Sequence, residues 1–295
     1  MSRLTHWLRN RRMLPPKAPP AAMDNIGRHR LAPPLACDLD AAPAERQALF
    51  ECVAAGWSLL GESEPYWSVL SAPKFRAAVF AGHADEFYAS EQDAVGLIQA
   101  VFARNGCSLS ALTSCLELGC GVGRSTASLA RLLPQVIAVD ISPAHLTAAR
   151  DHLARAGLAN VSWHQVRSVE DFAALPRFDL LFSEIVLQHN PPPVIAAMLE
   201  RLFARLDPGG YCLFQLPTYL EGYRFEVKSY LAASRPPDRN DLPRSMEMHL
   251  LPQRVVYRLM REAGIELIEV VEDNLTGHPS YQSMTFFARK ARPGA

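Results

Sequence analysis

Two carboxylates and three glycines form the densest group of chemistry-bearing residues in this chain. Glu117 ends an apolar run, glycines follow at positions 119, 121 and 123, and Asp140 comes 21 positions after Gly119 (140 − 119). Glycines permit positive φ and let a ligand approach the backbone closely. An acid about 20 residues after such a turn is placed to bind a ribose hydroxyl. The spacing predicts a nucleotide site, and Glu117 beside the turn favours a cation over a pyrophosphate.

The elements that must position these residues follow from the pattern around them. Residues 115–118 are apolar apart from Glu117, residues 125–133 suit a helix, and residues 135–139 form a second apolar run. This order predicts strand, tight turn, helix and strand. The free N–H groups at the start of the helix favour a polar or anionic ligand group.

The segment Glu117-Leu118-Gly119-Cys120-Gly121-Val122-Gly123 resembles the glycine-rich motif of class I S-adenosylmethionine-dependent methyltransferases. Its third glycine comes one place earlier than in the dinucleotide fingerprint G-x-G-x-x-G. The resemblance covers about residues 110 to 290 and implies an α/β fold. It implies a doubly wound, mostly parallel seven-stranded sheet with one antiparallel edge strand.

The resemblance also implies the cofactor, S-adenosylmethionine, and the residues around it. The glycine turn, with Gly119, Cys120, Gly121 and Gly123, would face the methionine moiety beside Glu117, and Asp140 with Ile141 would hold the ribose. A turn after a third expected strand, Val161–Val166, would meet the adenine. It carries Ser168 and Val169, with Glu170 as a further polar candidate, and a simple capping turn explains the same residues. Ser183, at the end of the next strand, completes the expected cofactor site.

Glu184 and His189 are the catalytic candidates because they follow a buried strand, Phe178–Phe182. In an open parallel sheet, residues just past the strand ends line the ligand crevice. A histidine with an ordinary pKa near ~6.5 suits a general base, and the alternative is a structural role such as capping a helix. Between residues 183 and 190 the oxygen ligands are Glu184 and Asn190, so no metal is expected.

The segment Asn190-Pro191-Pro192-Pro193 resembles the Asn-Pro-Pro-aromatic motif of nucleic-acid amino-methyltransferases. That motif belongs directly at a strand end and needs an aromatic residue to stack a flipped base. Here it begins six residues after Glu184 and no aromatic follows. We interpret it as the start of a helix over residues 194–206.

The substrate candidates come from two segments that flank the cofactor motif. Helical spacing predicts helices over residues 44–60 and 85–103, which would lie as a cap across the open end of the sheet, with Tyr66 and Trp67 between them. After a turn at Asp207–Gly210 and a fifth strand, residues 219–250 are irregular and polar. This insertion is the expected substrate lid, with Tyr219 and His249 as candidate contacts.

The sequence predicts three parts of the chain: an N-terminal arm, a helical cap and a catalytic domain. Residues 1–36 are basic and rich in proline, which predicts a mobile arm, with docking to an acidic partner or anionic lipid as the functional alternative. Residues 37–110 form the helical cap. Residues 111–295 form the S-adenosylmethionine-binding domain and end in a helix and two strands.

Composition limits the classes of function that the chain is expected to have. The formal net charge is zero, which does not favour a nucleic-acid partner, and the six cysteines lack metal-ligand spacing. We expect reduced thiols, a cytoplasmic location and no transmembrane segment. The expected activity is in-line methyl transfer to a small molecule or glycan, with O-methylation favoured and the oligomeric state open. The alternatives are a nucleic-acid methyltransferase, a nicotinamide-dependent oxidoreductase and a non-catalytic cofactor-binding regulator.

Overall fold

A computed structural model describes residues 34–89, 92–238, 246–278, 280–292 and 294. Contacts divide the chain into two units, Met1–Pro34 and Leu35–Ala295. The expected N-terminal arm, residues 1–36, lies outside the described residues up to residue 33. The unit Leu35–Ala295 contains the sheet and every helix discussed below.

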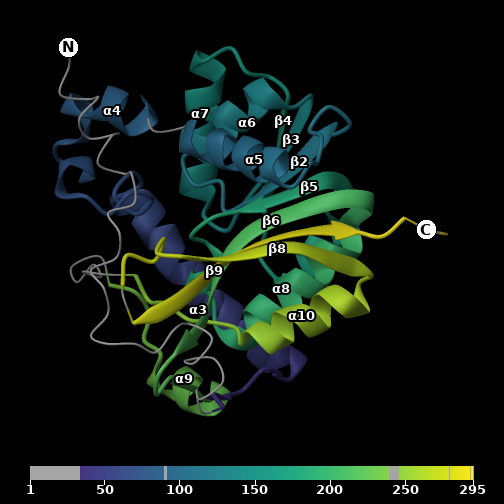
Figure 1. Ribbon diagram of the computed structural model, residues 1–295. Coiled ribbons are helices and arrows are strands. Elements are labelled where there is room, and N and C mark those ends of the chain that lie inside the picture. The colour runs from purple at the N-terminus through teal and green to yellow at the C-terminus, as the bar shows by residue number, and fades with distance from the viewer. Residues whose placement is uncertain (1–33, 90–91, 239–245, 279, 293, 295) are drawn as a thin grey trace, which may run out of the picture. The chain divides into compact units, whose positions relative to one another are not determined.

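A seven-stranded sheet forms the centre of this unit (Figure 1). In spatial order its strands are β4 (Val161–Gln165), β3 (Gln135–Asp140), β2 (Ser114–Leu118), β5 (Phe178–Ser183), β6 (Leu206–Leu220), β9 (Tyr281–Lys290) and β8 (Ile265–Asp273). Neighbours from β4 to β6 are parallel, whereas β9 is antiparallel to both β6 and β8. The expected fold is confirmed, with the antiparallel strand inside the edge hairpin and β8 outermost.

Helices cover both faces of the sheet because its buried strands alternate their side chains between two hydrophobic clusters. On one face α5 (Gln92–Arg104), α6 (Arg124–Leu132) and α7 (Pro143–Arg155) pack over residues such as Cys115 and Val136. On the other face η3 (Val169–Ala174), α8 (Pro192–Arg205) and α10 (Gln253–Glu262) pack over Leu116 and Ile137. The period-two alternation places neighbouring residues of one strand in different layers.

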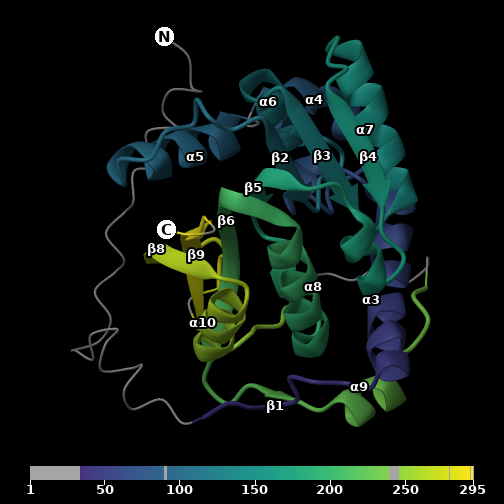
Figure 2. The same cartoon turned by 90° about the vertical axis from the view of Figure 1, so that its right-hand side faces the viewer.

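The helix α3 (Pro43–Ser63) joins the two layers (Figure 2). It contacts α7 on one side and α8 on the other, as well as α9 (Val227–Ala233). The second expected cap helix consists of α4 (Ala84–Ala89) and α5, and α5 packs against α6 rather than across the end of the sheet. Two short 3-10 turns, η1 (Pro73–Phe75) and η2 (Phe80–Gly82), connect α3 to α4.

The chain after β5 follows the expected order. The 3-10 turn η4 (Leu187–His189) precedes α8, which begins in the proline run as the sequence predicts. The expected turn Asp207–Gly210 is a bulge within β6, where Leu206 pairs with Phe178 and Tyr211 with Leu180. The expected lid contains β7 (Arg224–Phe225), which pairs with β1 (Ala36–Cys37), and α9; residues 239–245 lie outside the described part.

Two further properties concern the described residues as a whole. None of their helices combines the length and apolar character that a bilayer crossing requires. All six cysteines lie in the described part of the chain, and none of them forms a disulfide bond.

Candidate cofactor and acceptor site

The glycine turn between β2 and α6 has the backbone shape that glycine permits. Gly119 has φ of 76° and Gly121 has φ of 53°, both in the left-handed region. A Cβ at Gly119 would lie 2.4 Å from Cγ2 of Val186, and one at Gly121 would lie 2.9 Å from Cγ2 of Val69. Gly123 lies instead against Ala149 and Leu153 of α7, so it allows the turn to approach that helix closely and does not line the cavity. The N-cap residue of α6 is Gly123, which has no side chain to cap the first turn.

Asp140 joins the glycine turn to the start of α7. Its Oδ2 accepts a hydrogen bond from the Gly121 amide at 2.8 Å, and its Oδ1 accepts one from the Ser142 amide at 2.8 Å. His145 Nδ1 lies 3.7 Å from the same Oδ1. A carboxylate offers about four acceptor positions, so two remain for a ligand hydroxyl. Asp140 is therefore oriented by the turn that it helps to hold, and it lines the cavity.

Glu117 is a buried acid at the end of β2. It is 4% exposed, and its Oε2 accepts a hydrogen bond of 2.6 Å from Thr126 Oγ1. Burial raises the pKa of Glu117 to about 7, while the Thr126 hydroxyl and the Arg124 charge oppose that rise and Asp140 adds to it. A nearby cation favours the ionised form of a buried carboxylate. The site thus favours a positively charged ligand group next to the glycine turn.

A cavity of about 510 Å³ opens between these residues and the end of β5. This volume is in the usual range for small-molecule sites. The expected site residues that line it are Trp67, Glu117, Gly119, Cys120, Gly121, Asp140, Ile141, Glu184 and His189. The cavity therefore brings together the glycine turn, the acid of β3 and both catalytic candidates.

His189 faces this cavity from the turn η4. Its Nδ1 lies 2.8 Å from the backbone oxygen of Glu247, and since a carbonyl only accepts, Nδ1 carries the proton and Nε2 holds the free lone pair. Burial lowers the pKa of His189 to about 4, partly offset by the Glu247 carbonyl. The ring is thus neutral at pH 7 and can accept a proton at Nε2, although it is a weak base. The Trp57 ring lies 5.1 Å from it, centroid to centroid.

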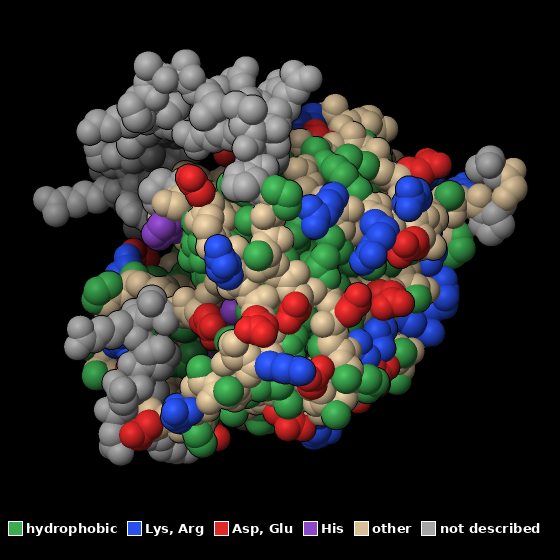
Figure 3. Space-filling model, turned by 90° about the horizontal axis from the view of Figure 1, so that it is seen from below, with side chains coloured by type: hydrophobic (Ala, Val, Ile, Leu, Met, Phe, Trp, Pro, Cys, Tyr) green, Lys and Arg blue, Asp and Glu red, His purple; other side chains and the backbone are tan. Residues whose placement is uncertain are grey.

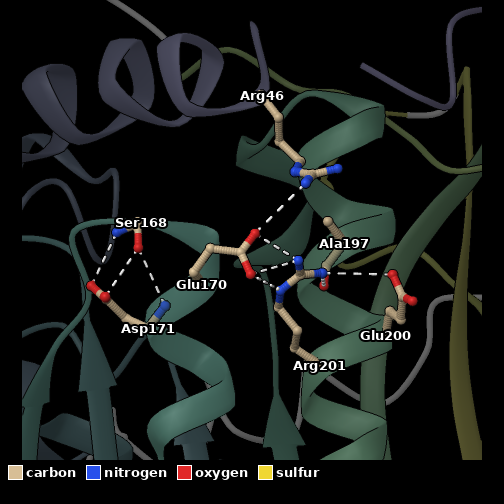
Figure 4. Close-up of polar contacts among 7 residues, drawn as sticks. All are labelled: Arg46, Ser168, Glu170, Asp171, Ala197, Glu200 and Arg201. Atoms are coloured by element: carbon tan, nitrogen blue, oxygen red, sulfur yellow. Dashed lines mark hydrogen bonds and ion pairs between the residues drawn. The ribbon is translucent and has the colours of Figure 1, made fainter. Parts of the chain in front are cut away.

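The turn expected to meet adenine is occupied by local hydrogen bonds (Figure 4). Ser168 caps η3 by accepting from the Asp171 amide, and its hydroxyl donates to the Asp171 carboxylate at 3.0 Å. Glu170 points away, to an ion pair with Arg201 and a 3.6 Å approach to Arg46 of α3. Ser168, Val169 and Glu170 do not line the cavity, and Val169 is buried in the core. These contacts are those of a turn that caps η3, the alternative interpretation of these residues.

Four further candidates also lie away from the cavity lining. Tyr66 stacks on Phe80 with ring centroids 3.4 Å apart. Ser183 is buried, with its hydroxyl directed to the Leu118 carbonyl at 3.4 Å, and Tyr219 pairs with β9.

The fourth is His249, which belongs to the lid segment and is buried. Tyr223 lies 2.9 Å from its Nδ1, and Glu247 lies 3.2 Å from its Nε2. The hydrogen bond with His249 is the main cause that holds the pKa of Glu247 below its ordinary value.

Sequence reasoning missed several cavity residues that long-range packing brings together. Trp57 comes from α3, Met246 and Met248 from the lid, and Leu275 with Thr276 from the loop between β8 and β9. The helical spacing of α3 marks Trp57 as buried but not the element that it faces. The methionines follow residues 239–245, and no local pattern assigns them to the site.

Part of the chain is similar in sequence to known methyltransferases. Residues 115–210 match a family model described as a methyltransferase domain. Trans-aconitate 2-methyltransferase from Methylobacterium radiotolerans is 36% identical over 126 residues, which cover 41% of this chain and 44% of that protein. Ubiquinone biosynthesis O-methyltransferase from Nitrobacter winogradskyi is 35% identical over 111 residues, 37% of this chain and 41% of that protein. The chain thus matches less than half the length of these relatives.

Solved structures share the fold at low identity. Magnesium protoporphyrin IX methyltransferase from Synechocystis PCC 6803 with bound S-adenosylhomocysteine gives a TM-score of 0.56 at 16% identity, covering 82% of this chain and 100% of that chain. Phosphoethanolamine N-methyltransferase 1 from Haemonchus contortus gives a TM-score of 0.55 at 12% identity. The match covers 86% of this chain and 51% of that chain. Residues 115–210 thus match a methyltransferase domain, and the chain shares the fold of solved methyltransferases, one of which holds S-adenosylhomocysteine.

Proposed function

We propose that this protein transfers a methyl group from S-adenosylmethionine to the hydroxyl of a small, uncharged, aromatic acceptor. The observation that carries the proposal is a cavity of about 510 Å³ whose lining includes both the glycine turn and His189. A methyl donor bound at the turn and an acceptor next to His189 would meet in the same cavity.

The residues around the turn fit the cofactor of the family. Gly119 and Gly121 hold the turn in left-handed backbone conformations and line the cavity, and Asp140 retains acceptor capacity for ribose hydroxyls. Glu117 is a buried acid that a cationic methionine moiety would stabilise in its ionised form. The cofactor would supply an activated methyl group, so the protein has mainly to position two reactants.

The acceptor side of the cavity supports an apolar, uncharged acceptor. Its walls come from Trp57, Met246, Met248 and Leu275. Among the described lining residues, the charged side chains are Glu117, Asp140, Glu184 and Arg124, and Arg124 belongs to the cofactor turn. Glu117 and Asp140 also belong to the proposed cofactor side, so an anionic acceptor would meet the carboxylate of Glu184. A flat apolar acceptor can instead stack on the indole of Trp57.

The weak basicity of His189 supports a phenol-type hydroxyl. Its Nε2 is the ring atom free to take a proton, and its pKa is held at about 4. A phenol with a pKa near ~10, like tyrosine, releases its proton far more readily than an aliphatic alcohol does. Hydroxyls of this acidity suit a weak base that acts while the methyl group is transferred.

A direct test measures S-adenosylhomocysteine formation by the full chain. Catechol, an aliphatic alcohol and an aromatic amine serve as acceptors, and we expect turnover with catechol alone. Replacing His189 with Ala should lower that turnover by about 10²–10⁴-fold while S-adenosylmethionine affinity is kept. His164→Ala, on β4 outside the cavity, is the control. Preference for the amine would reject O-methylation, and equal turnover in His189→Ala would reject the base.

A nucleic-acid acceptor has less support. The net charge is zero, and on the face drawn in Figure 3 the described Lys and Arg side chains are interspersed with Asp and Glu. Nucleic-acid binding needs clustered positive charge. A gel-shift assay with RNA and DNA at moderate salt would test this alternative directly.

A further inference from the structure

A buried amide on β6 reaches the strand end that carries the catalytic candidates. Gln215 is 1% exposed, and its Oε1 accepts a hydrogen bond of 3.0 Å from the Ile185 amide. Its Nε2 donates to Ser283 Oγ at 2.6 Å and to Gln188 Oε1 at 3.1 Å. Every hydrogen-bonding atom of this amide therefore has a partner. Its orientation is fixed because the Ile185 N–H can only donate.

The backbone that Gln215 holds is strained. Ile185 has φ of 57°, and among the described residues other than glycine it alone has a positive φ. A β-branched residue rarely adopts this conformation, which persists only where surrounding contacts enforce it. Ile185 is also 40% exposed, so packing of its own side chain does not explain the bend. Its neighbours Glu184 and Val186 line the cavity.

The same network reaches the lid. Gln188, which is 2% exposed, accepts a hydrogen bond of 2.6 Å from the His249 amide through its backbone oxygen. Its side-chain Nε2 lies 3.5 Å from Sδ of Met248. Next to it, the His189 ring bonds the Glu247 carbonyl. One polar network thus links the strand β6, the bend at Ile185 and the lid segment 247–249.

We propose that Gln215 is a positioning residue, which holds the left-handed bend at Ile185 and thereby orients Glu184 and His189 toward the acceptor. Gln215 is not among the residues that line the cavity, so it acts through the bend. The catalytic consequence rests on the proposed methyl transfer. The effect of Gln215 on the bend at Ile185 does not depend on the reaction, so the two effects are measured separately.

The conformational test follows the Ile185 amide by hydrogen exchange in the full chain. Gln215→Leu keeps a similar shape but removes the acceptor, and we expect Ile185 exchange to rise at least about ten-fold. Thr218→Val is the matched control, since Thr218 is a buried polar residue of the same strand whose hydroxyl lies 3.4 Å from the Gln282 carbonyl. An unchanged Ile185 exchange rate in Gln215→Leu would overturn the proposal.

The kinetic test uses catechol and S-adenosylmethionine. Gln215→Leu should lower kcat by about 10–100-fold with the S-adenosylhomocysteine Kd unchanged, because a small misplacement of catalytic groups has a cost of this size. Ile185→Gly relaxes the bend. Adding Gln215→Leu to this variant should therefore lower kcat by a smaller factor than adding it to the wild type. An equal cost in both backgrounds would overturn the positioning role. If the wild type does not methylate catechol, the proposed function fails, and exchange at Ile185 still decides the role of Gln215.

Gln215→Glu covers the case in which the Leu variant does not fold. A protonated carboxyl keeps one acceptor for the Ile185 amide and one donor for Ser283, and burial raises the pKa of such an acid. Because the carboxyl oxygen accepts from the Ile185 amide whether or not it is ionised, protection of Ile185 should stay near wild type in this variant. Loss of that protection in a folded Gln215→Glu protein would contradict the proposal.

Discussion

Replacing Glu117 with Gln should make the protein more stable at pH 8 and no more stable at pH 4. Glu117 is buried at the end of β2, and burial raises its pKa to about 7 from the ordinary value of 4.5. Glutamine has the same shape, and its Oε1 can still accept the hydrogen bond from Thr126 Oγ1. The substitution therefore removes the ionisation and leaves the packing in place.

The sign and size of the effect follow from proton linkage. Because the pKa of the folded state lies above that of the unfolded state, the folded protein binds this proton more tightly. The associated stability is fully present below pH 4.5 and is lost as the pH rises through 7. The difference between the two pKa values corresponds to about 3 kcal/mol of unfolding free energy at pH 8. In a domain of this size that is a shift in Tm of about 6–12 °C.

Thermal unfolding of both proteins between pH 4 and pH 8 measures this effect. The Tm of the wild type should fall relative to that of Glu117→Gln as the pH increases from 4.5 to 8. Glu200→Gln is the control, because the Glu200 side chain is 69% exposed and should not change the pH profile. Parallel Tm curves for the wild type and Glu117→Gln would show that the carboxyl ionises as easily in the folded state as in the unfolded chain, and would refute the reasoning.

Three further outcomes are expected. Asp140→Asn should weaken S-adenosylmethionine binding about ten-fold or more by calorimetry, because a carboxylate bonds hydroxyls more strongly than an amide does; unaltered affinity would reject the ribose role. Gly119→Ala should lower the free energy of unfolding, measured by urea denaturation, by at least about 1–2 kcal/mol, since φ is 76° and the new Cβ would meet Val186. The kcat should show no His189 ionisation above about pH 5, since the pKa of His189 is about 4; a step near pH 6.5 would contradict its burial.

The parts of the fold that the sequence predicts depend on neighbouring residues. The glycine turn, the helix after it and the following strand lie within about 25 residues, and their periodicity identifies them directly. Asp140 can be placed for the same reason, because parallel strands end at the same edge of a sheet. The proline run before α8 is interpreted correctly because proline favours the first turn of a helix.

The missed parts depend on contacts that only the folded chain selects, one of them local and the others between distant segments. The Ser168 hydroxyl has two uses, a cap or a ligand contact, and only the folded chain shows that Asp171 occupies it. The left-handed bend at Ile185 is disfavoured by its own sequence and exists because Gln215, 30 residues later, holds it. Likewise Trp57 has the spacing of any core residue, and the packing of α3 on both layers directs it to the cavity.

Two of the four tryptophans in the chain, Trp57 and Trp67, line the cavity. The indole of Trp57 lies near the His189 ring, and the Arg76 guanidinium stacks over Trp67 at 3.5 Å. Entry of a ligand would change the polarity around both rings, so intrinsic fluorescence should report occupancy without any label. A titration followed at the emission maximum, with Trp57→Phe to separate the two signals, could screen acceptors before any turnover is known.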